Sequence, residues 1–197
     1  MSNYLIPDTI YTKYKDYSDE ELIGLSAQGD EDARNVILYR YNPIVKRDAR
    51  LFYLAGGDTE DLIQEGMIAL FNAISGYKDD KGAKFSTYAT VCIDARIKAA
   101  VTRANRNKNK PLNEYVSIDD EADDTIAGCD FSPEQIYLRD EDITDMYRRI
   151  DEELSPMERK VALLYIQGLS YADIAAELGK SEKSINNALT RIKNKLR

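Results

Sequence analysis

The sequence predicts an all-α protein with two helical domains joined by an acidic linker, and three observations support this fold class. Helix caps followed by apolar residues at helical spacing recur along the chain, whereas the alternation typical of strands is nearly absent. A length of 197 residues is enough for one or two domains. Between about Lys108 and Ser132 no periodicity survives, and a stretch of this length indicates a boundary between domains.

These observations divide the chain into four segments. They are an N-terminal arm over residues 1–17, a helical domain over 18–110, the acidic linker over 111–132 and a second helical domain over 133–197. The composition, 43% hydrophobic and 31% charged, is that of a globular protein.

The N-terminal domain shows three helix starts ahead of its basic helix. Ser18 and Glu21 form a capping-box pattern, Asp30 caps a second helix, and Asp58 caps a third. Pro43 falls inside the second helical pattern, so we expect a kink or a restart of the helix there.

A fourth helix is predicted from Phe85 towards Asn105, and it has an apolar face and a cationic face. The apolar residues recur every four positions and are Ala89, Ile93, Ile97 and Val101. The basic residues on the other face are Arg96, Arg103, Arg106 and Lys110. Such a face can track phosphates, although a solvated helix surface shows the same pattern. Pro111 ends the helical pattern.

The last thirty residues carry the most specific local pattern, that of a helix-turn-helix. Ser170 with Asp173 caps the first helix, Gly179 supplies the turn, and Ser181 caps the second helix. The second helix has an apolar stripe made of Ile185, Leu189, Ile192 and Leu196. In this motif the outward residues of the second helix meet the major groove of DNA, and the alternative is a helical hairpin within a core.

The outward face of that second helix carries side chains suited to reading DNA. Asn suits adenine and Lys suits guanine, whereas Arg191 and Lys193 suit phosphates. The candidate DNA-contacting residues are Ser181, Glu182, Lys183, Asn186, Asn187, Thr190 and Arg191.

The net charge of −8 by itself disfavours nucleic acid as a partner, but the distribution of charge does not. Six basic residues face one acid between Asp94 and Lys110, and six face one acid between Lys180 and Arg197. Fifteen acids and three arginines lie between Glu114 and Glu153. We therefore attribute the negative total to the acidic segment between two basic ones.

Missing residue types exclude several kinds of site. The absence of histidine excludes Ser-His-Asp or Cys-His catalysis and any imidazole metal site. Cys92 and Cys129 form neither a zinc knuckle nor a disulfide framework. The start of the chain has no signal-peptide pattern, and the longest apolar run, residues 161–166, is too short for a membrane helix. We therefore expect a cytoplasmic, non-enzymatic protein without metal or cofactor.

Three blocks, in order, resemble the sigma-70 family of bacterial RNA polymerase sigma factors. The run Asp61–Leu70 resembles the segment that binds core polymerase, and Phe85–Thr90 resembles the segment that melts and reads the −10 promoter element. Leu154–Arg159 precedes the helix-turn-helix as in the part that binds the −35 element. The acidic connection and Pro111–Asn113 most resemble the sigma-H type, associated with stationary phase and sporulation. The resemblance implies a transcription initiation factor.

The resemblance also implies roles for individual residues. The contacts to core polymerase would be Asp61, Leu62, Gln64, Glu65 and Asn72. The residues that melt or read the −10 element would be Lys84, Phe85, Tyr88, Val91, Cys92, Ala95, Arg96, Lys98, Arg103 and Arg106. The seven helix-turn-helix residues would bind the −35 element. Phe85 and Tyr88 could equally lie in the core. Housekeeping members carry a tryptophan pair at Val91 and Cys92, so we expect this factor to depend on well-matched promoters.

As partners, the resemblance implies core RNA polymerase and promoter DNA and allows an anti-sigma factor, but it implies no membrane and no small-molecule substrate. Two other functions stay open. A free-standing helix-turn-helix transcriptional regulator would leave Asp61–Leu70 and Phe85–Thr90 without a role. A carboxylate-metal nuclease would use linker acids such as Asp119, which lack the alternating ligands and central glycine of a calcium loop.

Overall fold

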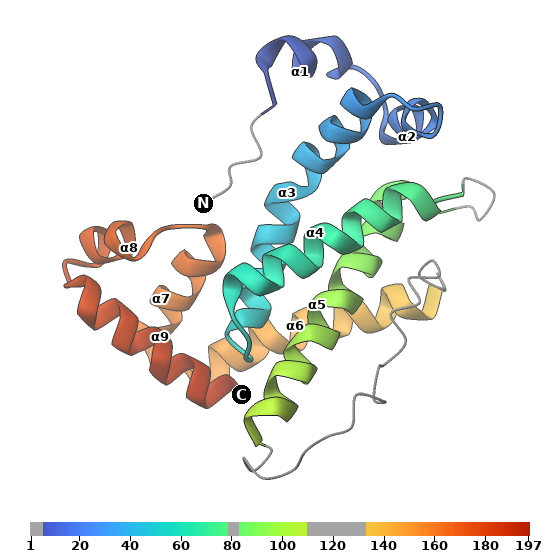
Figure 1. Cartoon of the computed structure of the whole chain (residues 1–197). Coiled ribbons are helices and arrows are strands. Elements are labelled where there is room, and N and C mark those ends of the chain that lie inside the picture. Colours follow the sequence, from blue (N-terminus) through green and yellow to red (C-terminus); the bar gives the residue numbers. More distant parts are fainter. Residues whose placement is uncertain (1–5, 79–82, 110–132) are drawn as a thin grey trace.

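The computed structural model describes residues 6–78, 83–109 and 133–197, and every regular element in these ranges is a helix. In chain order the helices are α1 (Asp8–Tyr14), α2 (Asp19–Ala27), α3 (Glu31–Tyr53), α4 (Thr59–Gly76), α5 (Phe85–Asn109), α6 (Pro133–Glu153), α7 (Pro156–Gln167), α8 (Tyr171–Leu178) and α9 (Glu182–Leu196) (Figure 1). The all-α prediction is confirmed. The predicted linker, including Asp119 and Cys129, lies outside the described residues.

The first five helices share one hydrophobic core, in which α4 and α5 lie side by side against α3 (Figure 1). The predicted apolar face of α5 forms part of this core: Ala89, Ile93, Ile97 and Val101 are buried. Helical spacing along α5 therefore predicted its buried face correctly.

The predicted helix caps of this domain are present. Ser18 forms the reciprocal capping box with Glu21, the side chain of Asp30 accepts from the backbone N–H of Ala33 at 3.0 Å, and Asp58 caps α4. The expectation of a restart at Pro43 is wrong, because α3 runs through it without a break. Pro43 is exposed, and the buried residues on either side of it hold the helix in the core.

The segment before residue 18 packs onto the same domain. Tyr14 of α1 is buried, and its hydroxyl donates to Asp30 Oδ2 at 2.6 Å. The guanidinium of Arg40 donates to the carbonyl oxygens of Tyr14 at 3.0 Å and Tyr17 at 2.9 Å. The sequence pattern did not predict these contacts, because they join residues far apart in the chain.

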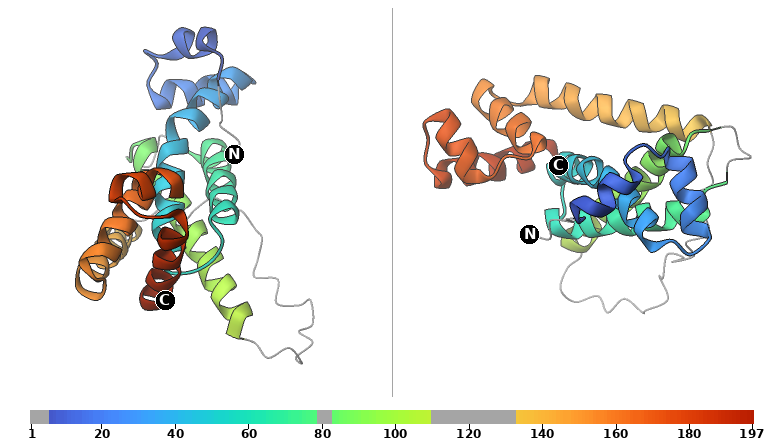
Figure 2. Two further views of the ribbon diagram at one scale, coloured as in Figure 1. Left: turned by 90° about the vertical axis from the view of Figure 1, so that its left-hand side faces the viewer. Right: turned by 90° about the horizontal axis from the view of Figure 1, so that it is seen from above.

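A second core unites α6, α7, α8 and α9 with the C-terminal end of α3, through Leu51 of the helix and Leu54, the residue that caps it (Figure 2). Polar contacts reinforce this junction. Arg50 Nη1 donates to the carbonyl oxygen of Tyr165 at 3.2 Å, and the hydroxyl groups of Thr59 and Tyr165 lie 2.7 Å apart. The two helical domains are therefore packed together through the end of α3.

Candidate nucleic-acid and polymerase interfaces

The helix-turn-helix consists of α8, a turn and α9. Ser170 and Asp173 form a reciprocal capping box at the start of α8, and hydrogen bonds from Ser170 lower the pKa of the Asp173 carboxyl. Gly179 has a φ of 61°, a left-handed conformation that favours glycine at this turn. The side chain of Ser181 accepts from the backbone N–H of Ser184 at 3.3 Å and so begins α9.

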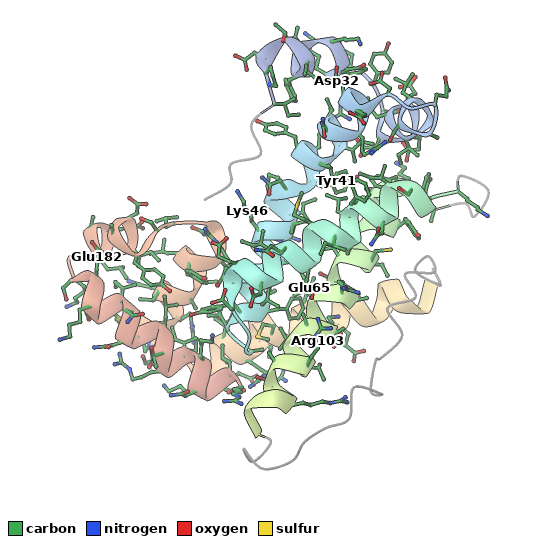
Figure 3. All side chains as sticks on the ribbon, viewed as in Figure 1. Asp32, Tyr41, Lys46, Glu65, Arg103 and Glu182 are labelled. Atoms are coloured by element: carbon green, nitrogen blue, oxygen red, sulfur yellow. The ribbon has the colours of Figure 1, made fainter. Side chains whose placement is uncertain are left out.

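The face of α9 that points away from the core carries the candidate DNA-contacting residues. Its opposite face is buried through Ile185, Leu189, Ile192 and Leu196. The exposed residues are Ser181, Glu182, Lys183, Asn186, Asn187, Thr190 and Arg191. Figure 3 shows Glu182 at the outer end of this helix, away from the N-terminal domain. The structure therefore groups all seven residues on one accessible surface.

A buried carboxylate, Glu158 of α7, holds α9 in place. It accepts from the backbone N–H of Ser155 at 3.0 Å, from Lys195 Nζ at 2.6 Å and from Arg191 Nε at 3.4 Å. The Lys195 hydrogen bond, helped by those from Ser155, lowers the pKa of Glu158 to about 2 against the opposing effect of burial. A Ser–x–x–Glu pattern such as Ser155 to Glu158 is typical of this cap, but nothing in the sequence indicates that Glu158 also contacts α9.

The candidate −10 residues, which are Lys84 and nine residues of α5, divide into exposed and buried groups. Lys84, Ala95, Arg103 and Arg106 are exposed, and Arg96 and Lys98 are partly exposed. Phe85, Tyr88, Val91 and Cys92 are buried. The sequence left Phe85 and Tyr88 open between DNA and the core, and the structure places both in the core. Val91 and Cys92, which the resemblance assigned to the −10 element, are also buried on the apolar side of α5, so their assignment as exposed contacts is corrected.

The burial of the two aromatic residues has a specific cause. The ring of Phe85 packs edge-on against Tyr41 and Tyr77, with centroids 5.3 Å and 5.4 Å away, and its backbone N–H donates to Glu20 at 3.1 Å. Tyr88 packs against Tyr77 at 5.7 Å. Stacking on an unpaired base would therefore compete with contacts within the core.

The candidate polymerase face lies on α4. Asp61 and Gln64 are exposed, whereas Leu62 is buried in the core, which corrects its assignment as a surface contact. Asn72 and Glu65 are partly buried. Two large apolar residues that sequence reasoning did not select, Ile68 and Phe71, are exposed on α4. Their helical spacing from Gln64, at +4 and +7, could have indicated them.

A pocket lies between the surfaces of α4 and α5. It is lined by Gly57, Asp61, Leu62, Gln64, Glu65, Ile68, Ala100, Arg103 and Ala104. Its lining therefore includes candidate polymerase contacts of α4 and Arg103, a candidate DNA contact of α5.

Carboxylates hold the candidate cations at both edges of α5. Glu65 pairs with Arg96 at 2.6 Å and with Arg103 at 2.7 Å on the α4 side. Lys98 pairs with Asp142 of α6 on the other side. The sequence placed Glu65 with the polymerase contacts and the arginines with the DNA contacts, whereas the structure brings them together.

Lys193 of α9 contacts the N-terminal domain. Lys193 Nζ donates to the carbonyl oxygen of Gly57 at 3.0 Å and lies 3.5 Å from the centroid of the Tyr53 ring.

In the described ranges, no group of acidic, histidine or cysteine side chains could hold a metal ion. The helices of this part of the chain also include none that is long and apolar enough to cross a membrane.

Comparisons with known proteins agree with the resemblance. Residues 38–107 match the family model of sigma-70 region 2, and residues 145–196 match that of sigma-70 region 4. The RNA polymerase sigma-H factors of Bacillus licheniformis and Bacillus subtilis (strain 168) are each 40% identical over 90% of this chain, covering 84% and 86% of their own lengths. The crystal structure of the sigma-H factor from Fusobacterium nucleatum is 31% identical, covers 68% of this chain and 89% of its own, and has a TM-score of 0.31. The chain therefore belongs to the sigma-70 family and is a non-enzymatic sigma factor for transcription initiation, similar to sigma-H factors.

Proposed function

We propose that this sigma factor directs core RNA polymerase to promoters by placing α5 on the −10 element and α9 on the −35 element. The observation that carries the proposal is the face of α9. Seven exposed residues, including Lys183 and Asn187, lie opposite a fully buried apolar stripe. This is the arrangement that a recognition helix needs to enter the major groove.

The role of α5 rests on its cations rather than on its aromatic residues. Arg103 and Arg106 are exposed, and Arg96 and Lys98 lie at the two edges of the same surface. Contacts from these side chains to phosphates would position the DNA, and the exposed Ala95 would lie close to the bases. Phe85 would stabilise the fold of this surface and would not touch DNA.

The exposed part of α4 is the proposed surface for core polymerase. Asp61 and Gln64 supply polar contacts, and Ile68 and Phe71 supply apolar area beside them. Gln64→Ala should weaken binding to core polymerase, measured by titration of labelled factor. An unchanged affinity would show that this assignment is wrong.

The two domains, over residues 18–110 and 133–197, would hold two DNA elements at once, with 111–132 as the connection. Two linked weak contacts bind more tightly than either alone, because the second becomes intramolecular. As a partner of polymerase, the chain would act in the cytoplasm. An anti-sigma factor as a further partner stays a prediction.

In vitro transcription with core polymerase and a promoter library tests this proposal. We expect transcription that depends on both the factor and core polymerase and that selects two separated promoter elements. The alternative, a free-standing regulator, predicts tight and specific binding of the purified protein alone. A gel shift with and without core polymerase distinguishes the two functions.

A further inference from the structure

Glu65 lies where the polymerase face and the DNA face meet. It belongs to α4, but its carboxylate is turned towards α5, next to Arg103 (Figure 3). Oε2 accepts from Arg96 Nε at 2.6 Å, and Oε1 accepts from Arg103 Nη2 at 2.7 Å. The Glu65 side chain is 20% exposed. Both carboxylate oxygens are engaged within the domain, so little of this side chain is available to polymerase.

The two arginines share one edge of α5. They are seven residues apart, which is two helical turns or about 10 Å along the axis. The Arg103 side chain is 58% exposed and that of Arg96 is 27% exposed, so both reach the surface. Each is at the same time paired with the less exposed carboxylate of Glu65. With one carboxylate and two guanidinium groups, this cluster keeps a net positive charge.

We propose that Glu65 is a positioning residue that orients Arg96 and Arg103 for DNA phosphates, and that it is not a polymerase contact. This inference rests on the proposed role of α5 at the −10 element. An arginine loses rotamer freedom when it binds a phosphate, and fixing its side chain beforehand reduces that cost. All three residues belong to the N-terminal domain, where α4 and α5 share one core, so DNA can bind without separating them.

Simple electrostatics and a positioning role of Glu65 predict opposite effects of one substitution on promoter affinity. Removing a negative charge beside DNA should, by simple electrostatics, tighten DNA binding. If Glu65 positions the arginines, Glu65→Ala should instead weaken promoter binding by about five- to tenfold, because two long side chains must then be ordered during binding. Binding of the factor to core polymerase should stay within about twofold of the wild type, since the carboxylate faces α5.

The experiment uses holoenzyme assembled from core polymerase and the full-length factor. Promoter affinity is measured at several salt concentrations, and core affinity is measured separately by titration. The variants are Glu65→Ala, the isosteric Glu65→Gln and Arg96→Ala/Arg103→Ala, with and without the Glu65 change. Glu60→Ala is the matched control, because it removes an exposed carboxylate from the first turn of the same helix. Thermal unfolding of each variant reports whether it is folded.

Loss of promoter affinity in Glu65→Ala, with intact core binding and no further loss in the double-arginine background, supports the proposal. Equal losses in both backgrounds would mean a general structural role and would overturn it. Weaker core binding, as expected for Gln64→Ala, would restore Glu65 to the polymerase face. Tighter promoter binding would show that Glu65 competes with phosphate. If Glu65→Ala does not fold, the same outcomes are read from Glu65→Gln.

The arginine variants separate this inference from the proposed function. If Arg96→Ala/Arg103→Ala leaves promoter affinity and its salt dependence unchanged, the proposed role of this edge of α5 fails, and the inference fails with it. If the double variant weakens promoter binding but Glu65→Ala does not, only the inference fails.

Discussion

The two helices proposed to face DNA differ in what their polar side chains contact. The outer face of α9 presents amide, hydroxyl and ammonium groups at the surface, among them Lys183 and Asn187. On α5, Arg96, Arg103 and Lys98 are paired with carboxylates of neighbouring helices. This difference separates two tasks: α9 is suited to reading base edges, whereas α5 carries cations held in place for the phosphate backbone.

The carboxylates on the two sides of α5 also differ. Glu65 belongs to the same domain as the arginines it holds, whereas Asp142 lies on α6 and reaches Lys98 from the C-terminal half of the chain. Asp142 is 53% exposed and Glu65 is 20% exposed. The two ion pairs of Glu65 therefore form within the N-terminal domain alone. The ion pair between Lys98 and Asp142 forms only when the two domains are packed together.

The largest expected effect tests whether the aromatic residues of α5 serve the core. Phe85→Ala should lower the free energy of unfolding by about 3 to 5 kcal/mol, because it leaves a cavity between Tyr41 and Tyr77. Chemical denaturation measures this loss. A folded variant of nearly wild-type stability that is slow to melt promoters would instead return Phe85 to the DNA face.

The second prediction tests the base-reading role of α9. Lys183→Ala or Asn187→Ala should reduce discrimination at a −35 base by about 1 to 3 kcal/mol, because each removes a candidate base-edge contact. Core binding should stay intact. Promoter selection from a library randomised at the −35 element gives the result, and unchanged selection would exclude these side chains as base contacts.

The third prediction concerns the support of α9 by Glu158. Its folded pKa of about 2 lies below the ordinary value of 4.5, so its ion pairs stabilise the fold above pH 4.5 and this stabilisation is lost as the pH falls towards 2. Glu158→Gln should cost about 1 to 3 kcal/mol near neutral pH and should flatten the stability curve between these pH values. Denaturation across this range checks it. An unchanged pH profile would contradict the assigned role.

The smallest expected effect concerns the pair on the α6 side of α5. Asp142→Ala should change the free energy of unfolding by less than about 1 kcal/mol, because the pair with Lys98 is solvent-exposed. Denaturation of the variant beside Glu65→Ala checks the contrast. A larger loss for Asp142→Ala than for Glu65→Ala would reverse the order proposed for the two edges of α5.

Local patterns predicted much of this molecule because their causes are local. The caps at Ser18, Asp30 and Ser170 and the buried stripe of α9 follow from hydrogen bonds and helical spacing within a few residues. The seven residues of the outer α9 face followed from the same spacing.

The remaining features depend on contacts between distant segments. Leu51 joins the core of the C-terminal domain, and Glu65 turns towards α5, because of how whole helices pack. A capping or periodic pattern carries no information on such packing. For the same reason the burial of Phe85, between rings from two other segments, could not be separated from exposure in advance.

Position-resolved promoter selection by holoenzymes carrying Asn187→Ala or Arg103→Ala tests the division between α9 and α5 most directly. We predict that Asn187→Ala relaxes base preference within the −35 element alone. We predict that Arg103→Ala weakens binding to all sequences alike. It should also reduce the slope of log affinity against log salt concentration by about one, the value expected for one lost phosphate contact. Two results for Asn187→Ala would contradict the account. One is a change of base preference at the −10 element, and the other is a uniform loss of binding without any change of base preference.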